Sequence, residues 1–372
     1  MAINVFVPKF HTEEILEEIR ECLNKGWTGL GFKTTAFEEA WKEYTGLPHA
    51  HFLNSNTSGL HLALHIFKNT YGWNEGDEII TTPLTFVSTN HAILYERLQP
   101  VFADVDEYLC LDPDSIRKRI TNKTRAVMYV GIGGNTGQLD EVVSICKEHK
   151  LKLILDAAHM AGSRYHGKHV GNEADVAVFS FQAVKNLATA DSGMICFQDE
   201  ELDKWARKLA WLGISTDTYA RFNKNAGSYK WRYDVPDVGF KYHGNSIIAS
   251  IGLVQLKYLD EDNGRRNEIA ATYNSILSDR KHIHAIPVAP DCYSARHLYQ
   301  IVVENRDEVL QKFYDNDIFP GVHYWDNTNY QMYSHAKGSC PNAEDASRKI
   351  ISLPLHLNLS SEDILRVTDI LK

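Results

Sequence analysis

An aspartate and a lysine near the ends of two predicted strands could serve one aromatic cofactor from opposite ends. Asp156 directly follows the apolar run 151–155, and Lys185 comes shortly after the run 176–181. Each residue alone has an ordinary interpretation, a turn or cap for the aspartate and a solvated surface charge for the lysine. Together they match pyridoxal phosphate chemistry. That chemistry requires a lysine that bonds the cofactor aldehyde and moves protons, and a carboxylate that keeps the pyridine nitrogen protonated.

A polar segment at the start of a predicted helix supplies a candidate phosphate site. Residues 55–59 read Ser-Asn-Thr-Ser-Gly and lie between a short predicted strand near His51 and a helical pattern. The free N–H groups and the dipole of a helix N-terminus favour an anion, although ordinary helix caps share this composition. Thr57 and Ser58 are the candidate phosphate ligands, and Phe86 is the candidate stacking surface for the cofactor ring.

Short apolar runs that alternate with helical patterns must position these residues. The strand candidates are 78–82, 100–104, 126–130, 151–155, 176–181 and 194–197, and the helix candidates include 58–68, 139–149 and 201–212. Strands that are apolar throughout and separated by helices indicate an α/β fold, with a mainly parallel sheet covered on both faces. Ligands of such sheets bind at the carboxyl ends of the strands, where Asp156 and Lys185 are expected.

The chain divides into two predicted parts. A helix after Thr12, with Thr12 as its N-cap and Gly26 as its stop, begins a large domain over residues 1–245 as a helical arm. A long helix is expected over 246–261, because apolar residues recur there at helical spacing. From about residue 265 onward the chain mixes short helices and strands. We therefore expect a smaller C-terminal α+β domain over residues 246–372.

Motifs along almost the whole chain resemble one known family. They are SNTSGLHLAL (55–64), TTPLTFVSTNHAI (81–93), PVFADVD (100–106), GGNTGQLDEV (133–142), LDAAHMAGSRYHGKHVG (155–171), SFQAVKNLATADSGM (180–194), GFKYHGNSIIASIGLVQLKYLDE (239–261), RRNEIAATY (265–273) and LPLHLNLSSED (353–363). In this order they resemble the DegT/DnrJ/EryC1/StrS family of pyridoxal-phosphate-dependent sugar aminotransferases. The resemblance implies fold type I, that of aspartate aminotransferase, with a mainly parallel seven-stranded sheet in the large domain.

The resemblance also implies a role for each matched residue. Lys185 would be the Schiff-base lysine and Asp156 the partner of the pyridine nitrogen, and His159 matches a position near the phenolic oxygen of the cofactor. Phe86 matches the stacking aromatic ring. The matched phosphate contacts are Thr57, Ser58, Ser180 and Lys241, the last of which reaches the phosphate across a dimer interface in this family. A homodimer with shared active sites is therefore expected, with L-glutamate as the amino donor.

The resemblance favours a nucleotide-linked keto-deoxysugar as the amino acceptor, in surface-polysaccharide or natural-product biosynthesis. The candidate substrate contacts are Trp27, Thr28, His323 and Tyr324. Tyr299 and Trp325 could also contact the substrate, and packing in the core or at an interface is the alternative role for all of these aromatic residues and for His323. Several positions depart from the family pattern: Asn56, Gly59, Gly131, Gln182, Ser192, Lys241 and His243. Because most of them lie near the substrate or the phosphate, a smaller acceptor such as dihydroxyacetone phosphate stays open.

Two other functions compete with amino transfer on the same fold. A related sugar dehydratase carries histidine at the lysine position, so Lys185 disfavours that function. A non-catalytic regulator that binds pyridoxal phosphate is the second alternative, although the chain shows neither a helix-turn-helix extension nor a basic segment.

Composition and the pattern of charges and cysteines limit the partners, metals and location that are expected for this protein. The 372 residues carry a formal net charge of −9 with no dense Lys/Arg run, which disfavours nucleic-acid binding. Six scattered cysteines without a C-x-x-C pair fit reduced thiols, and the His61 and His65 pair lacks a third ligand, so no metal is expected. The first residues lack the pattern of a signal peptide, and no apolar run has membrane-spanning length. We expect a cytoplasmic protein with no membrane partner.

Overall fold

A seven-stranded sheet forms the centre of the computed structural model, which describes residues 2–215 and 233–372. Its strand order is β2-β10-β9-β6-β5-β3-β4. The strands are β2 (His51–Leu53), β3 (Glu78–Thr81), β4 (Gln99–Phe102), β5 (Thr124–Val130), β6 (Lys152–Asp156), β9 (Val176–Ser180) and β10 (Gly193–Phe197). Each strand candidate from the sequence lies within two residues of an observed strand at either end, so the expected α/β sheet is confirmed.

The sheet is parallel except at one strand. β10 runs antiparallel to both of its neighbours, β2 and β9, whereas the remaining pairs are parallel. Asp156, the last residue of β6, pairs with Val130 at the end of β5 and with Val178 in β9. The carboxyl ends of these three neighbouring strands therefore meet at one edge, where a parallel sheet binds its ligands.

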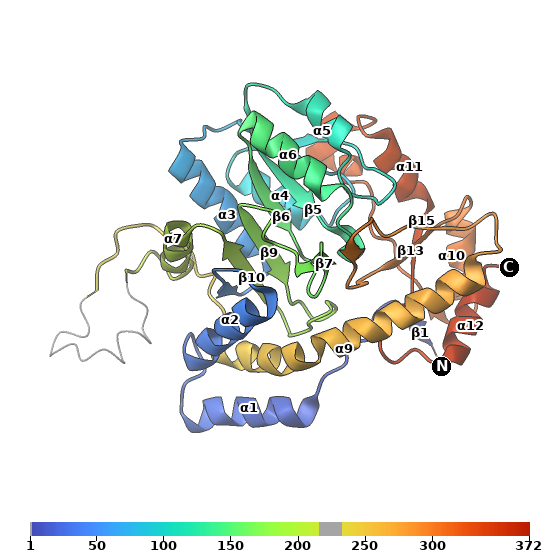
Figure 1. Ribbon diagram of the computed structural model, residues 1–372, viewed down its shortest axis with the longest axis horizontal. Coiled ribbons are helices and arrows are strands. Elements are labelled where there is room, and N and C mark those ends of the chain that lie inside the picture. The colour runs from blue at the N-terminus through green and yellow to red at the C-terminus, as the bar shows by residue number, and fades with distance from the viewer. Residues whose placement is uncertain (1, 216–232) are drawn as a thin grey trace.

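Helices cover both faces of this sheet (Figure 1). One face is covered by α3 (Asn56–Tyr71), α4 (Ser88–Tyr95) and α7 (Glu200–Ala210), and the other by α2 (Phe32–Thr45), α5 (Pro113–Arg119), α6 (Leu139–His149) and the start of α9. Leu60, Ile93 and Leu209 belong to the first apolar core, and Trp41 and Ile145 belong to the second. Burial of these side chains supplies the main driving force that holds the sheet edge in place.

The N-terminal helix α1 (Thr12–Asn24) packs along α9, as Figure 1 shows. The prediction that Thr12 caps this helix was wrong. Thr12 is the first helical residue, and His11 occupies the cap position without a side-chain hydrogen bond to the helix. Gly26 follows the helix with a φ of 63°, a left-handed conformation that favours glycine, so the predicted stop is confirmed.

The long helix α9 (Ser246–Leu277) extends well beyond the predicted end at 261. The predicted end was too early because Asp262, Asn263 and Gly264 interrupt the apolar spacing. At these residues the helix passes from one packing region to the next. The helix continues because Ile269 and Tyr273 are buried in a further apolar core. α9 thus contacts α1 and α2 with its first half and α12 with its second. The division of the chain after residue 245 stays a prediction.

The C-terminal part surrounds a three-stranded sheet of order β11-β13-β15. Its elements are β11 (His284–Ala285), β12 (Cys292–Tyr293), β13 (Tyr299–Val302), α10 (Arg306–Tyr314), β14 (Ile318–Phe319), η2 (Asn327–Asn329), η3 (Gln331–Ala336), α11 (Pro341–Lys349), β15 (Ile350–Leu353) and α12 (Ser361–Asp369). β1 (Ile3–Asn4) pairs with β14, and β12 pairs with β7 (Arg164–Tyr165), which also pairs with β8 (Lys168–His169). These pairings bring the N-terminal segment and the C-terminal part close to the ligand-binding edge of the large sheet.

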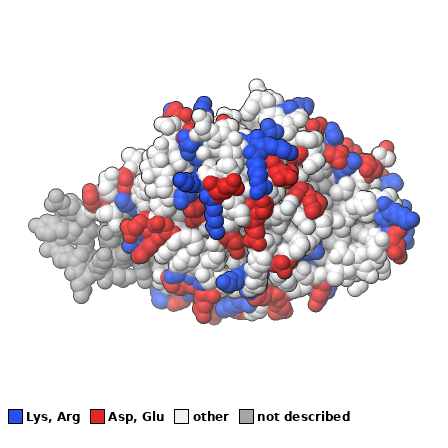
Figure 2. Space-filling model, turned by 45° about the horizontal axis from the view of Figure 1, so that its top comes forward, with Lys and Arg blue, Asp and Glu red and all other residues white. Residues whose placement is uncertain are grey.

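Basic and acidic side chains are interspersed on the face shown in Figure 2. This mixture agrees with the net charge of −9, and this face presents no continuous basic tract to a nucleic acid. Over the described part of the chain, no helix combines the length and the apolar character that a membrane crossing requires.

Candidate active site

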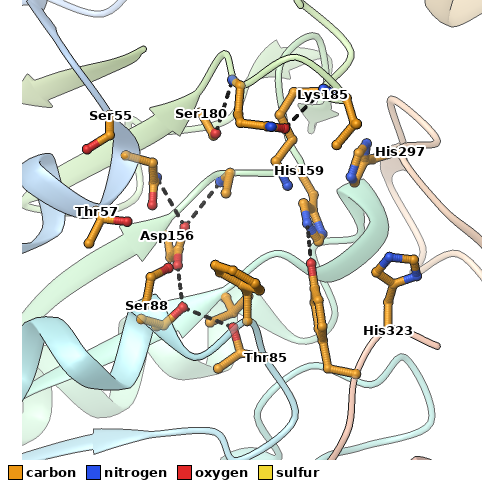
Figure 3. Close-up of a pocket in the computed structure, with 18 of the residues that line it drawn as sticks. Ser55, Thr57, Thr85, Ser88, Asp156, His159, Ser180, Lys185, His297 and His323 are labelled. Atoms are coloured by element: carbon orange, nitrogen blue, oxygen red, sulfur yellow. Dashed lines mark hydrogen bonds between the residues drawn. The ribbon is translucent and has the colours of Figure 1, made fainter. Parts of the chain in front are cut away.

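A cavity of about 480 Å³ opens at the carboxyl ends of β5, β6 and β9. Asp156 and Lys185 both line it, and Figure 3 shows them on different sides with His159 between them. Further lining residues come from the start of α3 (Ser55, Asn56, Thr57), from the segment around the start of α4 (Thr85, Phe86, Ser88, Thr89), from β9 and the loop after it (Ser180, Gln182), and from the N- and C-terminal segments (Phe6, His297, His323, Tyr324). We refer to this space as the main cavity.

Asp156 is 3% exposed, and three hydrogen-bond donors hold its carboxylate. Thr89 Oγ1 donates to Oδ2 at 2.7 Å, while Asn56 Nδ2 at 3.3 Å and the backbone N–H of Ala158 at 3.2 Å donate to Oδ1. Thr85 Oγ1 lies 3.0 Å from Thr89 Oγ1 and must donate to it, since the Thr89 proton is used on Asp156. Burial raises the pKa of Asp156, and these donors oppose that rise.

Lys185 follows β9 on a turn that its backbone N–H closes by donating to the carbonyl of Gln182 at 2.8 Å. Its side chain is only partly exposed, and burial lowers the pKa of its amine to about 8, while the charge of Asp156 acts in the opposite direction. An amine with this pKa is neutral in an appreciable fraction of molecules near neutral pH. Lys185 can therefore act as a nucleophile and as a general base.

The N-terminus of α3 forms one wall of the main cavity. Ser55 caps the helix by accepting a hydrogen bond from the backbone N–H of Ser58 at 3.1 Å. The side chains of Ser55, Asn56 and Thr57 line the cavity, with Ser180 from the end of β9 also in its wall. Ser58 differs, because its hydroxyl donates to Asn54 Oδ1 at 2.7 Å and its side chain does not line the cavity. Helix N-termini of this kind bind phosphate groups.

His159 is locked into one tautomer by its two partners. The backbone N–H of Gly133 donates to its Nδ1 at 3.1 Å, so this nitrogen carries no proton in the neutral ring. Its Nε2 then bears the proton and donates to the hydroxyl oxygen of Tyr324 at 3.0 Å. Burial and the charge of Lys185 hold the pKa of His159 well below its usual value, which keeps the ring neutral. The hydroxyl proton of Tyr324 is thereby left for another acceptor.

Aromatic rings border the rest of the main cavity. Phe86 is 60% exposed and its ring centroid lies 6.1 Å from that of Tyr324. The ring of His297 lies 4.2 Å from that of His159, centroid to centroid. His323 also lines the cavity, with its Nδ1 at 2.9 Å from the hydroxyl of Ser352, and burial lowers its pKa to about 4. The cavity thus offers flat, uncharged surfaces to a flat ligand.

Comparison with known proteins identifies the family. Residues 9–372 match the model of the DegT/DnrJ/EryC1/StrS aminotransferase family. This chain belongs to that family. It is 34% identical to the spore coat polysaccharide biosynthesis protein SpsC of Bacillus subtilis, over 96% of this chain and 93% of that protein. It is also 34% identical to the dTDP-4-dehydro-2,3,6-trideoxy-D-glucose 4-aminotransferase of Saccharopolyspora spinosa, over 99% of this chain and 95% of that enzyme.

The fold of this aminotransferase is also found in a solved structure. The putative sugar aminotransferase Spr1654 of Streptococcus pneumoniae, in its PLP form, superposes with a TM-score of 0.90 at 28% identity, covering 99% of this chain and 97% of that one. The same protein is also known in a PMP form. The enzymes of the family depend on pyridoxal phosphate, which is therefore the cofactor of this aminotransferase.

The residues of the main cavity fit this cofactor. A buried carboxylate, a partly buried amine and a helix N-terminus surround one space, and an exposed aromatic ring stands at its border. Asp156 suits the pyridine nitrogen, because three donors already favour its charged form. Thr57 and Ser180 suit the phosphate, and Lys185 suits the aldehyde. The rings that border the cavity suit the apolar faces of the cofactor.

Three further predicted site residues lie outside the main cavity of their own chain. Trp27 donates from Nε1 to the carbonyl of Leu30, and the carbonyl of Thr28 accepts from the backbone N–H of Ser246. The amine of Lys241 lies 3.5 Å from the ring centroid of Trp211. None of these three side chains therefore lines the main cavity of its own chain. The two additional aromatic residues, Tyr299 and Trp325, do not line the cavity either.

Several residues of the site were not predicted from the sequence. Asn56 and Thr89 hold Asp156, and His297 and Phe6 line the main cavity. Asn56 was noted only as a departure from the family pattern, and Thr89 lies in a quoted motif without a role. Asn56 and Thr89 are separated from Asp156 by 100 and 67 residues of sequence, and local sequence patterns do not reveal contacts at such separations. The Gly133 contact similarly gives the glycine-rich segment near 131–134 a role in fixing His159.

The His61 and His65 pair binds a carboxylate. His61 Nε2 lies 2.8 Å and His65 Nδ1 lies 3.0 Å from Glu96 Oε1, and His61 Nδ1 lies 2.9 Å from the hydroxyl of Tyr242. Within residues 2–215 and 233–372, no group of three or more His, Cys, Asp or Glu side chains is arranged to hold a metal ion. These histidines are therefore explained by hydrogen bonds that tie α3 to the end of α4.

Proposed function

We propose that this aminotransferase moves the amino group of L-glutamate to a nucleotide-linked keto-deoxysugar, in the biosynthesis of a polysaccharide or of a natural-product sugar. The central observation is that Asp156, at the end of β6, and Lys185, in the loop after the neighbouring strand β9, line one cavity that fits pyridoxal phosphate. The names of the relatives support a sugar acceptor. One is a spore coat polysaccharide biosynthesis protein, and another is named for a dTDP-linked keto sugar.

Lys185 is the residue that bonds the cofactor and moves the proton. Pyridoxal phosphate supplies an electron sink that stabilises negative charge on the carbon next to the transferred nitrogen. With pyridoxal phosphate and the amino donor bound, the lowered pKa of the Lys185 amine would suit it to take the proton from that carbon. Asp156, held by Thr89, Asn56 and Ala158, keeps the opposite end of the cofactor ring protonated.

The remaining site residues hold the cofactor and the substrates. Thr57, Ser58 and Ser180 bind the cofactor phosphate, with Ser58 contributing through the helix N-terminus rather than through its hydroxyl. Phe86 stacks on the ring. His159 lies near the phenolic oxygen, and the free hydroxyl proton of Tyr324 makes that residue a donor to a bound oxygen. His323 and Tyr324 are the substrate contacts within the chain.

A homodimer with shared active sites accounts for the predicted site residues that lie outside the main cavity of their own chain. Lys241 is on the surface and outside the cavity of its own chain, which supports a contact with the cofactor phosphate of a second subunit. Trp27 and Thr28 would contact substrate in the same way. Exposed apolar side chains such as Tyr95 and Leu212 are available to such an interface.

The donor and the acceptor can be tested with the purified protein. The protein with its cofactor bound should absorb visible light, and L-glutamate should remove that absorbance if it is an amino donor. The aminated enzyme is then offered a dTDP-linked keto-deoxysugar or dihydroxyacetone phosphate. Return of the absorbance with the nucleotide sugar supports the proposal. Return with dihydroxyacetone phosphate alone would assign the smaller acceptor, and no change with any amino donor would indicate a regulator that only binds the cofactor.

A further inference from the structure

A second cavity adjoins the main cavity at Lys185. Phe6, Val184, Lys185 and His297 line both spaces, so these side chains lie between them. The N-terminal segment, α9 and the segment after β15 supply the other walls. The enclosed volume is about 20 Å³, which is enough for a small polar group but not for a whole substrate. The second cavity therefore suits one functional group of a ligand that reacts at Lys185.

The charges that line the second cavity are mostly positive. Lys9, Lys185 and Arg266 stand against the single carboxylate of Asp262. Arg266 Nη1 lies 3.5 Å from Asn263 Oδ1, which is a long contact. Burial lowers the pKa of Arg266 to about 10, with the charge of Asp262 acting in the opposite direction. A guanidinium has five N–H donors, so most of those on Arg266 still lack an acceptor within the described chain.

His356 adds a second, independent indication of a ligand. Its side chain lines the second cavity and is 7% exposed. Burial lowers its pKa, while the charge of Asp363 and a contact with the backbone of Asn4 act in the opposite direction. Neither ring nitrogen of His356, however, meets the geometry of a hydrogen bond with any described residue. Buried polar groups in native proteins are nearly always paired, so two such atoms beside an unsatisfied guanidinium indicate that this space receives a hydrogen-bonding group.

We propose that the second cavity binds a carboxylate of the amino donor, with Arg266 as its principal contact and His356 as a hydrogen-bond donor. The inference rests on the proposed function, in which an amino acid reacts at Lys185 and must place its carboxylates close by. The planar guanidinium matches a carboxylate with two parallel hydrogen bonds, which explains an arginine at this position. The α-carboxylate and the distal carboxylate of glutamate could both form these hydrogen bonds. A comparison of L-glutamate with L-alanine shows which of the two the second cavity binds.

Binding without reaction is the first test. Glutarate has two carboxylates and no amino group, so calorimetric titration of the cofactor-loaded enzyme measures carboxylate binding alone. Arg266→Gln should weaken glutarate binding about tenfold or more, and Arg266→Lys should weaken it less, because the charge is kept. The matched control is Arg265→Gln on the same helix. Arg265 is bonded to Glu268 and to the carbonyl of Leu359 and does not line the cavity, so its loss should leave glutarate binding unchanged.

The donor half-reaction separates the two carboxylates. L-glutamate and L-alanine both carry an α-carboxylate, and only glutamate carries a distal one. If Arg266→Gln raises the donor concentration required for half-maximal loss of the visible absorbance with both amino acids, the second cavity holds the α-carboxylate. If only the value for glutamate rises, it holds the distal carboxylate. Either result supports the inference.

Unchanged glutarate binding and unchanged donor dependence in Arg266→Gln would overturn the inference, even though the wild-type enzyme reacts with glutamate. A wild-type enzyme that reacts with no amino donor would instead contradict the proposed function. If Arg266→Gln fails to fold or to hold the cofactor, His356→Phe replaces it, since it removes two unpaired polar atoms from a buried position and should fold. Wild-type glutarate affinity in a folded His356→Phe enzyme would then count against the inference.

Discussion

Burial shifts the pKa values of Asp156 and Lys185, two ionisable groups of the main cavity, in opposite directions. It raises the pKa of Asp156 and lowers that of Lys185, since the charged form of each group is disfavoured away from water. The three donors to Asp156 oppose the rise of its pKa and so favour the charged form, whereas Lys185 has no comparable hydrogen-bond partner among the described residues. The proposed roles use both effects, since Asp156 is to carry a negative charge at one end of the site and Lys185 is to provide a neutral amine at the other.

Thr89 should be the most important of the donors that support Asp156, because its hydrogen bond is the shortest at 2.7 Å. Thr89→Val keeps the shape of the side chain and removes the hydroxyl. The pKa of Asp156 should then rise further, and kcat should fall about tenfold or more, the usual effect of losing a hydrogen bond to a charged group. Steady-state rates measure this loss.

Thr272→Val is the matched control for Thr89→Val. The Thr272 hydroxyl is exposed and donates to the carbonyl of Glu268 within its own helix, so its removal should leave kcat within about twofold of the wild-type value. Equal rates for the two variants would show that the hydrogen bond to Asp156 does not matter for catalysis.

The lowered pKa of Lys185 predicts how the cofactor-free enzyme takes up pyridoxal phosphate. Only the neutral amine attacks the aldehyde, and burial brings the pKa to about 8, so the neutral fraction rises from about one tenth at pH 7 to about nine tenths at pH 9. The uptake rate should therefore increase about tenfold between these values and then level off. Stopped-flow absorbance measures the rate. A rate that keeps rising steeply above about pH 10 would indicate an ordinary lysine pKa.

At the scale of elements, α3 must lie close to β9 to present its N-terminus to the main cavity. Gly59 permits this approach, because a Cβ at this position would come within 2.4 Å of Val178 Cγ1 and 3.2 Å of Leu53 Cδ1. Both neighbours are fully buried, so they have little room to move.

Gly59→Ala should therefore lower the free energy of unfolding by about 1–3 kcal/mol and weaken cofactor binding, despite the better helix propensity of alanine. Gly264→Ala in α9 is the comparison, since a Cβ there meets nothing within 4 Å. That change should stabilise the protein by about 0.5–1 kcal/mol. Denaturant unfolding measures both values. A stabilised Gly59→Ala protein would mean that the packing of α3 on β9 is looser than the structure indicates.

The sequence predicted the strands better than the contacts between elements. Apolar runs located the strands of the large sheet, and strand ends drew attention to Asp156 and Lys185, which the structure places in the wall of one cavity. Thr89, His297 and Arg266 could not be found in this way, because each acts through packing of elements that are distant in sequence. The end of α9 was also misplaced, since polar residues at 262–264 interrupt a helix that tertiary packing maintains.

At the scale of the whole molecule, the proposed homodimer with shared active sites predicts that two inactive variants complement each other. Lys185→Ala and Lys241→Ala should each be nearly inactive alone. In a mixed dimer, one site combines Lys185 of one subunit with Lys241 of the other. Random mixing of equal amounts should then restore about a quarter of the wild-type activity, since half of the dimers carry one complete site out of two.

The mixing experiment requires subunits that have been dissociated and reassociated, with each variant treated alone as the control. Sedimentation then establishes that dimers have formed again. If the mixture is no more active than the separate variants while dimers are present, Lys241 does not contribute to the site of a second subunit.

The proposed site is tested most directly by identifying the residue that bonds the cofactor covalently. Borohydride reduces and fixes the bond between pyridoxal phosphate and its lysine, and mass spectrometry of the digested protein then locates the modified residue. We expect a single modified lysine, Lys185, because this amine shares the main cavity with Asp156. Modification of a different lysine, or of none, would contradict this expectation.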